Sequence, residues 1–155
     1  MSTSDNRELV ITREIDLPAE RLYRGWTDPT LLKQWFCPKP WSVARAEPDV
    51  RPGGTCLVVM RSPEGEEISN PGVYLEVVPN RRLVFTDAYL QAWEPSGQAF
   101  MTAMVTFDDL SRGRTRYIAR AMHWSAADRQ KHEKMGFHEG WNKCLNQLIE
   151  LVGRN

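Results

Sequence analysis

The segment Gly136 to Val152, GFHEGWNKCLNQLIELV, carries the most regular pattern in the chain. On a helical wheel its polar residues fall on one side and its apolar residues on the other. The apolar side consists of Phe137, Trp141, Cys144, Leu145, Leu148, Ile149, Leu151 and Val152. A helix with one such stripe has to bury it against another layer of structure. The segment therefore predicts a long C-terminal helix that packs on a sheet.

Two glycines, Gly136 and Gly140, lie in this predicted helix, although each costs about 1 kcal/mol in helix propensity relative to alanine. The preceding residues, DRQKHEK, are charged all round and predict either exposed turns or a separate short helix. We expect Gly136 to allow a bend or a close approach where the exposed piece meets the buried piece. We also expect the buried piece to close a cavity.

The rest of the chain predicts one strand, two short helices and then six strands. RELVITREIDL, residues 7–17, has the period of two that a strand with one buried face shows. PAERLYRGWT and DPTLLKQWF predict the helices, with Asp28 as N-cap of the second and Pro29 in its first turn. From Trp41 to Met122, apolar runs alternate with turn signals such as RPGG and PEGE. The fold class is α+β: a twisted, seven-stranded antiparallel sheet wrapped around a long C-terminal helix.

Composition limits the class of protein. At 155 residues we expect a single domain over residues 7–153, with residues 1–6 flexible. The chain has 41% hydrophobic and 26% charged residues, which is typical of a soluble globular protein. Its 20 basic and 20 acidic residues argue against a general nucleic-acid binder. We find no apolar run near the ~18 residues of a membrane helix and no signal-peptide pattern, which predicts a cytoplasmic protein without membrane insertion.

Four blocks of the sequence carry a family resemblance: RLYRGWTDPTLLKQWF, DVRPGGTCLVVMRSPEG, GVYLEVVPNRRLVFT and GFHEGWNKCLNQLIELV. Together they resemble the family related to the C-terminal domain of the activator of Hsp90 ATPase, within the START-like, or helix-grip, superfamily of polyketide cyclases and lipid-transfer domains. The resemblance covers roughly residues 8–152. It implies a helix-grip fold with an apolar cavity between helix and sheet, and a chaperone or stress-related contact. The resemblance leaves the activity open. The sequence is also compatible with a homodimer.

Alternation along the strands predicts which side chains face this cavity. On AFMTAMVTF the more apolar set faces the helix, and on TRYIARAM the arginines belong outside. Small alanines on the inward face would leave space. The predicted ligand-binding residues are Trp35, Trp41, Met60, Tyr74, Phe85, Tyr89, Met101, Ala103, Tyr117, Ala119, Phe137 and Trp141. The alternative is that any one of them is an ordinary core residue.

Catalytic candidates are few. Asp87 shares an inward face with Phe85, where a desolvated carboxylate could act as a general base; the alternative is that it lies in water at the end of the strand. His123 ends a strand near the start of a helix, where it could touch the mouth of a pocket; the alternative is an ordinary surface histidine. His132 begins a zinc-helix pattern, but the second histidine would have to stand at Gly136, so we expect no metal site. The three cysteines, Cys37, Cys56 and Cys144, are far apart in the sequence, and the simplest interpretation is that they are small buried hydrophobic residues. Neither a cofactor motif nor a nucleophile motif is present.

Two functions remain open from the sequence. The first is binding of a small hydrophobic or aromatic ligand in the cavity, without a cofactor, with Tyr117 or Asp87 setting its orientation. The alternative is a small cyclase-type or hydrolase-type enzyme that uses polar groups in the same cavity. Polar groups converging on the cavity would favour the second.

Overall fold

The computed structural model describes residues 7–97 and 99–153, so the tail expected to be flexible, residues 1–6, lies outside the described part. No helix in these ranges is both long and apolar enough to cross a membrane. The elements are β1 (Glu8–Ile15), α1 (Ala19–Thr27), α2 (Pro29–Trp35), β2 (Ser42–Pro48), β3 (Cys56–Arg61), β4 (Glu67–Asn70), β5 (Val73–Val78), β6 (Arg82–Thr86), the short 3-10 helix η2 (Gln91–Trp93), β7 (Met101–Ser111), β8 (Arg114–His123), α3 (Ala126–Lys134) and α4 (Phe137–Gly153).

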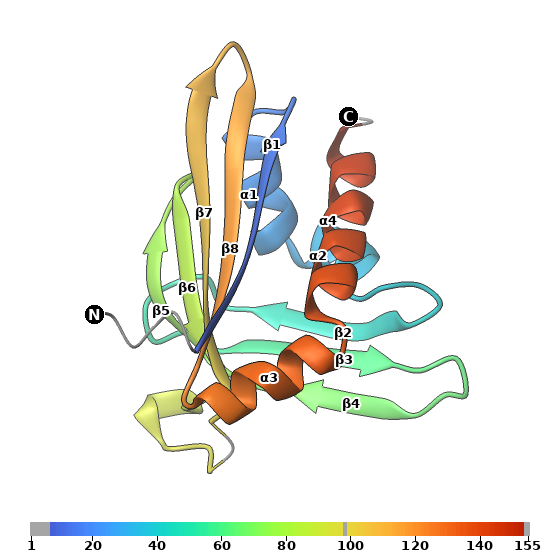
Figure 1. Ribbon diagram of the computed structural model, residues 1–155, viewed down its shortest axis with the longest axis vertical. Helices are drawn as coiled ribbons and strands as arrows, with labels where there is room; N and C mark the ends of the chain where they lie inside the picture. Colours follow the sequence, from blue (N-terminus) through green and yellow to red (C-terminus); the bar gives the residue numbers. More distant parts are fainter. Residues whose placement is uncertain (1–6, 98, 154–155) are drawn as a thin grey trace.

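The strands form two antiparallel sheets. One has the order β1-β8-β7-β6-β5, the other β2-β3-β4, and an isolated bridge between Thr55 and Val73 links them. Figure 1 shows β2, β3 and β4 running across one end of the five-stranded sheet. Helices α1 and α4 both lie on one side of that five-stranded sheet. Helix α4 packs on α1, α2 and β1, while α3 crosses between β8 and α4. The predicted α+β, helix-grip fold is confirmed.

The predicted number of seven strands in one sheet was wrong. The missed element is β4, a four-residue strand whose side chains are all exposed. It pairs with β3 across the predicted PEGE turn, with Met60 opposite Ile68. Because no side chain of β4 is buried, its sequence carries no alternation between apolar and polar residues. Only the pairing with β3 makes it a strand.

The predicted cap of α2 and the predicted bend at Gly136 are confirmed, and α3 also has a cap. The carboxylate of Asp28 accepts a hydrogen bond from the backbone N–H of Thr30 at 2.9 Å, so it caps α2. The hydroxyl of Ser125 accepts one from the N–H of Asp128 at 3.1 Å and caps α3. Gly136 joins α3 to α4 with φ at +94°, a conformation that favours glycine. The chain can therefore turn sharply between the two helices.

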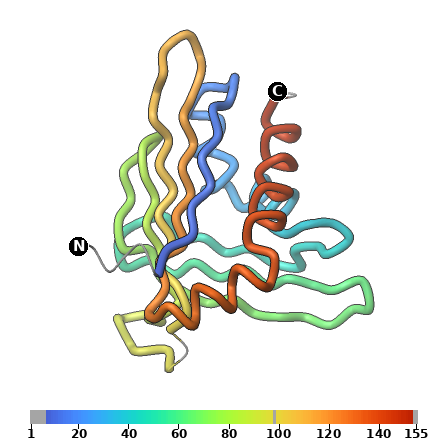
Figure 2. The backbone as a smooth tube through the Cα atoms, in the orientation of Figure 1, coloured from blue at the N-terminus to red at the C-terminus, as the bar shows by residue number. Residues whose placement is uncertain are grey.

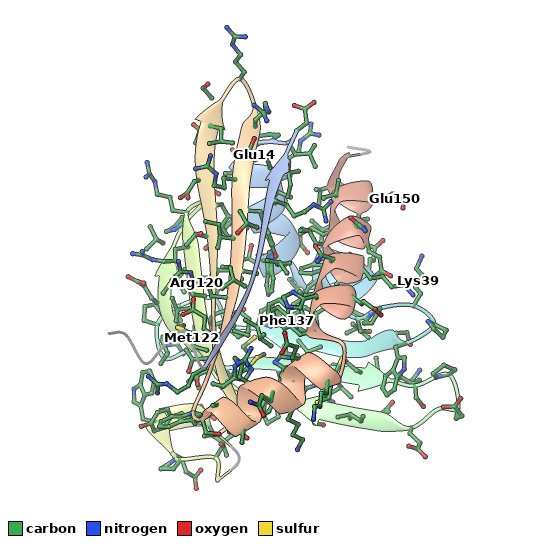
Figure 3. All side chains as sticks on the ribbon, in the orientation of Figure 1. Glu14, Lys39, Arg120, Met122, Phe137 and Glu150 are labelled. Atoms are coloured by element: carbon green, nitrogen blue, oxygen red, sulfur yellow. The ribbon has the colours of Figure 1, made fainter. Side chains whose placement is uncertain are left out.

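The core lies between the five-stranded sheet and the helices. The inward set of β7, Ala103, Val105 and Phe107, is buried as predicted. The stripe of α4 supplies the opposite layer, with Leu145 and Leu148 almost completely buried. Figure 3 shows Phe137 at the beginning of α4, on the side of the strands. The first turns of α4 are where this packed layer opens into a cavity.

Candidate ligand-binding cavity

A cavity of about 390 Å³ lies between the α3–α4 junction, the first two helices and the strands of both sheets. Its wall is mostly apolar. The described residues that line it are Trp26, Trp35, Phe36, Pro38, Cys56, Val58, Met60, Asn70, Pro71, Gly72, Phe85, Thr86, Asp87, Met101, His132, Met135, Gly136, Phe137, Gly140, Trp141 and Cys144. The volume is within the usual range of small-molecule sites.

Helix α4 supplies one wall through residues spaced three or four apart. The rings of Phe137 and Trp141 stack obliquely with centroids 4.9 Å apart. Between them Gly140 leaves the helix surface bare, and a Cβ added there would meet no atom within 4 Å. Cys144 continues this wall one turn later. The glycine that interrupts the apolar stripe therefore faces open space, and that space is the cavity.

The opposite wall is a cluster of aromatic rings centred on Trp26. Its ring lies 4.9 Å from Trp35 and 5.7 Å from Phe85, centroid to centroid. The indole N–H of Trp26 donates to the hydroxyl of Tyr117 at 3.0 Å, and that of Trp35 donates to the carbonyl of Gly25 at 2.8 Å. Both polar groups are thus satisfied inside the protein, so these two rings present apolar surfaces to the cavity.

One end of the cavity is polar, because His132 lines it there and is hydrogen-bonded to His123 behind it. Nδ1 of His123 lies 2.8 Å from the carbonyl oxygen of Arg7, and its Nε2 lies 2.8 Å from Nδ1 of His132. Phe100 packs against both imidazoles, with ring centroids 5.4 and 5.1 Å away. Figure 2 shows the segment before β7 lying beside α3. Burial, helped by the neighbouring His123, lowers the pKa of His132 to about 4, so His132 is neutral at pH 7.

Asp87 also lies on the wall, but its carboxylate is engaged by the backbone. Oδ1 accepts hydrogen bonds from the N–H groups of Phe100 at 2.8 Å and Met101 at 3.1 Å. These bonds fix the chain where it enters β7. Asp87 therefore combines a structural role with a charged position on the cavity wall.

The cavity thiols are poor nucleophiles at neutral pH. Burial raises the pKa of Cys144 to about 12, and its Sγ lies 3.5 Å from the carbonyl oxygen of Phe36. Burial also raises the pKa of Cys56. Both stay protonated at pH 7, whereas thiol chemistry needs the thiolate. Within residues 7–97 and 99–153, no group of three or more His, Cys, Asp or Glu side chains is placed to hold a metal ion.

Half of the predicted ligand-binding residues line this cavity: Trp35, Met60, Phe85, Met101, Phe137 and Trp141. Tyr74, Ala103, Tyr117 and Ala119 are buried in the packed core and do not line it. Trp41 borders a separate hollow next to α2. Tyr89 is 36% exposed and packs on Trp93. Alternation identified the inward faces of β7 and β8 correctly, but it does not show where along a strand the core ends and the cavity begins.

The histidine expectations were wrong in two respects. His123 is buried and bonded to His132, and it does not line the cavity. His132, which the charged run around it predicted to be exposed, is only 9% exposed and lines the cavity. The hydrophobic pattern carries no signal for it, because the other residues of α3 are polar or small and mostly exposed.

Trp26 also lines the cavity, and its position can be recognised in the sequence. It follows Leu22 by four residues, a spacing that places both side chains on the same, buried face of α1.

The helix-grip architecture and the cavity under the C-terminal helix define a START-like protein. The chain belongs to the family described as Activator of Hsp90 ATPase homolog 1-like protein, whose sequence model matches residues 16–153. The resemblance read from the sequence is thereby confirmed.

Solved structures of bacterial proteins agree. A crystal structure from Nitrosomonas europaea is 42% identical, with a TM-score of 0.93 over 99% of this chain and 97% of that one. One from Mycobacterium smegmatis is 26% identical, with a TM-score of 0.79 over 97% and 93%. A Rhodobacter sphaeroides structure, 17% identical over 99% and 97%, shares the fold with a TM-score of 0.85. No curated protein matches the chain.

Proposed function

We propose that the protein binds a small hydrophobic or aromatic molecule in the cavity beneath α4. The observation that carries this proposal is Gly140. A glycine within a helix costs about 1 kcal/mol relative to alanine, and no neighbouring atom prevents a side chain at this position. The lost stability is explained if the empty space itself is what the protein needs.

The dimensions support a ligand of about two rings. An apolar cavity of about 150 Å³ can hold benzene, and this one measures about 390 Å³. Burial of apolar ligand surface contributes about 25 cal/mol per Å² before the cost of association is subtracted. For a molecule of about ten non-hydrogen atoms, this gives a dissociation constant of about micromolar to millimolar.

Tryptophan fluorescence tests the proposal, because Trp26, Trp35 and Trp141 line the cavity. Nitrobenzene is a neutral aromatic quencher, and we expect a saturable component in its titration. Gly140→Phe should fill the space and abolish that component. The matched control is Glu139→Phe, which adds the same ring at an exposed position of α4 and should leave saturation intact. A folded Gly140→Phe variant with unchanged saturable quenching would refute cavity binding.

A further inference from the structure

The two histidines at the polar end form a directed series of hydrogen bonds. The carbonyl oxygen of Arg7 can only accept, so Nδ1 of His123 must be the donor. In a neutral His123 the other nitrogen, Nε2, then carries a lone pair, and Nδ1 of His132 donates to it. His132 is neutral, because burial holds its pKa near 4. Its remaining nitrogen, Nε2, is therefore an unprotonated acceptor.

This acceptor is open to the cavity. Within the described ranges Nε2 of His132 has no hydrogen-bond partner, yet it is not among the buried side-chain atoms that lack one. It is thus reachable from outside the protein. His132 is otherwise buried and lines the cavity. Since His132 lines the cavity and little else of it is accessible, we assign this accessible edge of the ring to the cavity.

The charge at this end of the cavity disfavours an anionic ligand. Phe100 connects the two polar groups, since its ring packs on His132 while its N–H donates to the carboxylate of Asp87. A carboxylate, like the bare Nε2, only accepts hydrogen bonds. Among the described residues that line the cavity there is no lysine and no arginine. An anionic ligand would be buried here beside a negative charge and without a counter-charge, which is strongly unfavourable.

We infer that the cavity selects a neutral aromatic molecule with a hydrogen-bond donor, such as a phenolic hydroxyl, which donates to Nε2 of His132, and that it rejects aromatic acids. The inference rests on the proposed function and specifies its ligand class. His132 accepts the hydrogen bond of the ligand's donor. His123 is a positioning residue: the carbonyl of Arg7 fixes the tautomer of His123, and His123 in turn fixes the tautomer of His132.

Three probes of similar shape test the inference: 2-naphthol, its methyl ether and 2-naphthoate. NMR titrations of the ¹⁵N-labelled protein give their dissociation constants. We expect 2-naphthol to bind roughly three- to ten-fold more tightly than the ether, the range for one neutral hydrogen bond. We expect 2-naphthoate to bind at least about ten-fold more weakly than 2-naphthol. In His132→Phe the preference for 2-naphthol over the ether should vanish, while the ether still binds. His138→Phe, at an exposed position, is the matched control and should keep the preference.

The outcomes separate the two proposals. If no probe binds the wild type, the proposed function fails and the inference fails with it. If 2-naphthol and the ether bind equally, or the preference survives His132→Phe, the proposed function stands and the inference is overturned. Tightest binding of 2-naphthoate would also overturn the inference.

A measurement on the wild type makes the test independent of how the variant folds. The ¹⁵N signals of the imidazoles should show Nδ1 protonated and Nε2 bare in both His123 and His132. The Nε2 signal of His132 should move with 2-naphthol and stay in place with the ether. A protonated Nε2 on His132 in the free protein would overturn the inference.

Discussion

Nε2 of His123 lies 2.8 Å from Nδ1 of His132, and this bond joins the last residue of β8 to α3. Both rings are almost completely buried, at 4% and 9% exposure. Helix α3 has only one buried residue, which is His132. The packing of α3 on the sheet therefore depends on an imidazole that remains neutral.

Stability should fall as the pH is lowered from about 6.5 to about 4. The unfolded chain takes up the His132 proton near the ordinary pKa of 6.5, and the folded protein takes it up near pKa 4. Between these values the unfolded state holds more protons, so acid favours unfolding. The contribution is complete above about pH 6.5 and stops changing below about pH 4. The shift corresponds to about 3 kcal/mol, and because solvent in the cavity screens part of it, we expect a loss of about 1–2 kcal/mol.

Urea denaturation at several pH values between 7.5 and 4.5 measures this loss. His132→Gln should remove a large part of the pH dependence, because glutamine does not titrate. His138→Gln replaces an exposed histidine of α4 and should follow the wild type. The explanation is wrong if His132→Gln shows the same slope as the wild type.

The order of most elements was predictable because they carry their own periodic patterns, which β4, η2 and α3 lack. The stripe of α4, the two short helices with the Asp28 cap, and the alternation on β1, β7 and β8 all require a buried face on one side. Such a face is a local property of the sequence. Strand β4 has no buried face, so it depends on a partner that the sequence does not identify.

The cavity was predictable only in part. Six of its wall residues were among the predicted ligand-binding residues: Trp35, Met60, Phe85, Met101, Phe137 and Trp141. Ala119 shares such a face, yet it is fully buried in the core cluster and away from the cavity. His132 and Phe100 meet because the segment before β7 folds beside α3. Contacts between segments this far apart in the sequence depend on how the whole chain packs. A periodic pattern within one segment therefore cannot predict them.

Tyr117→Phe should destabilise the protein by about 1–3 kcal/mol. The change removes one oxygen and leaves the indole N–H of Trp26 without the acceptor that it now has at 3.0 Å. Both residues are buried, so water cannot replace the lost partner. Tyr89→Phe, in a half-exposed ring, is the matched control and should change the free energy of unfolding by less than about 0.5 kcal/mol. Equal effects in the two variants would show that the Trp26–Tyr117 bond contributes nothing.

Gly140→Ala should stabilise the protein by about 0.5–1 kcal/mol. Alanine is the better helix former, and the added methyl group enters open space. Gly136→Ala provides the contrast, because φ at that position is +94° and alanine there is strained; it should destabilise by about 1 kcal/mol or more. Thermal or urea unfolding measures both. A destabilised Gly140→Ala variant would mean that the glycine serves packing and not the cavity.

Gly25→Ala should destabilise the protein although it makes the same gain in helix propensity as Gly140→Ala. A methyl group at Gly25, on α1, would overlap the end of the Leu148 side chain on α4, and Leu148 is completely buried. We expect a net loss of about 1–3 kcal/mol from this overpacking. Leu148→Ala alone should cost about 2–5 kcal/mol. In the double variant the alanine at 25 meets a shortened neighbour, so the combined loss should be smaller than the sum of the two. Urea denaturation of the four proteins in this cycle measures the coupling, and strictly additive losses would show that α1 and α4 are not held together at this contact.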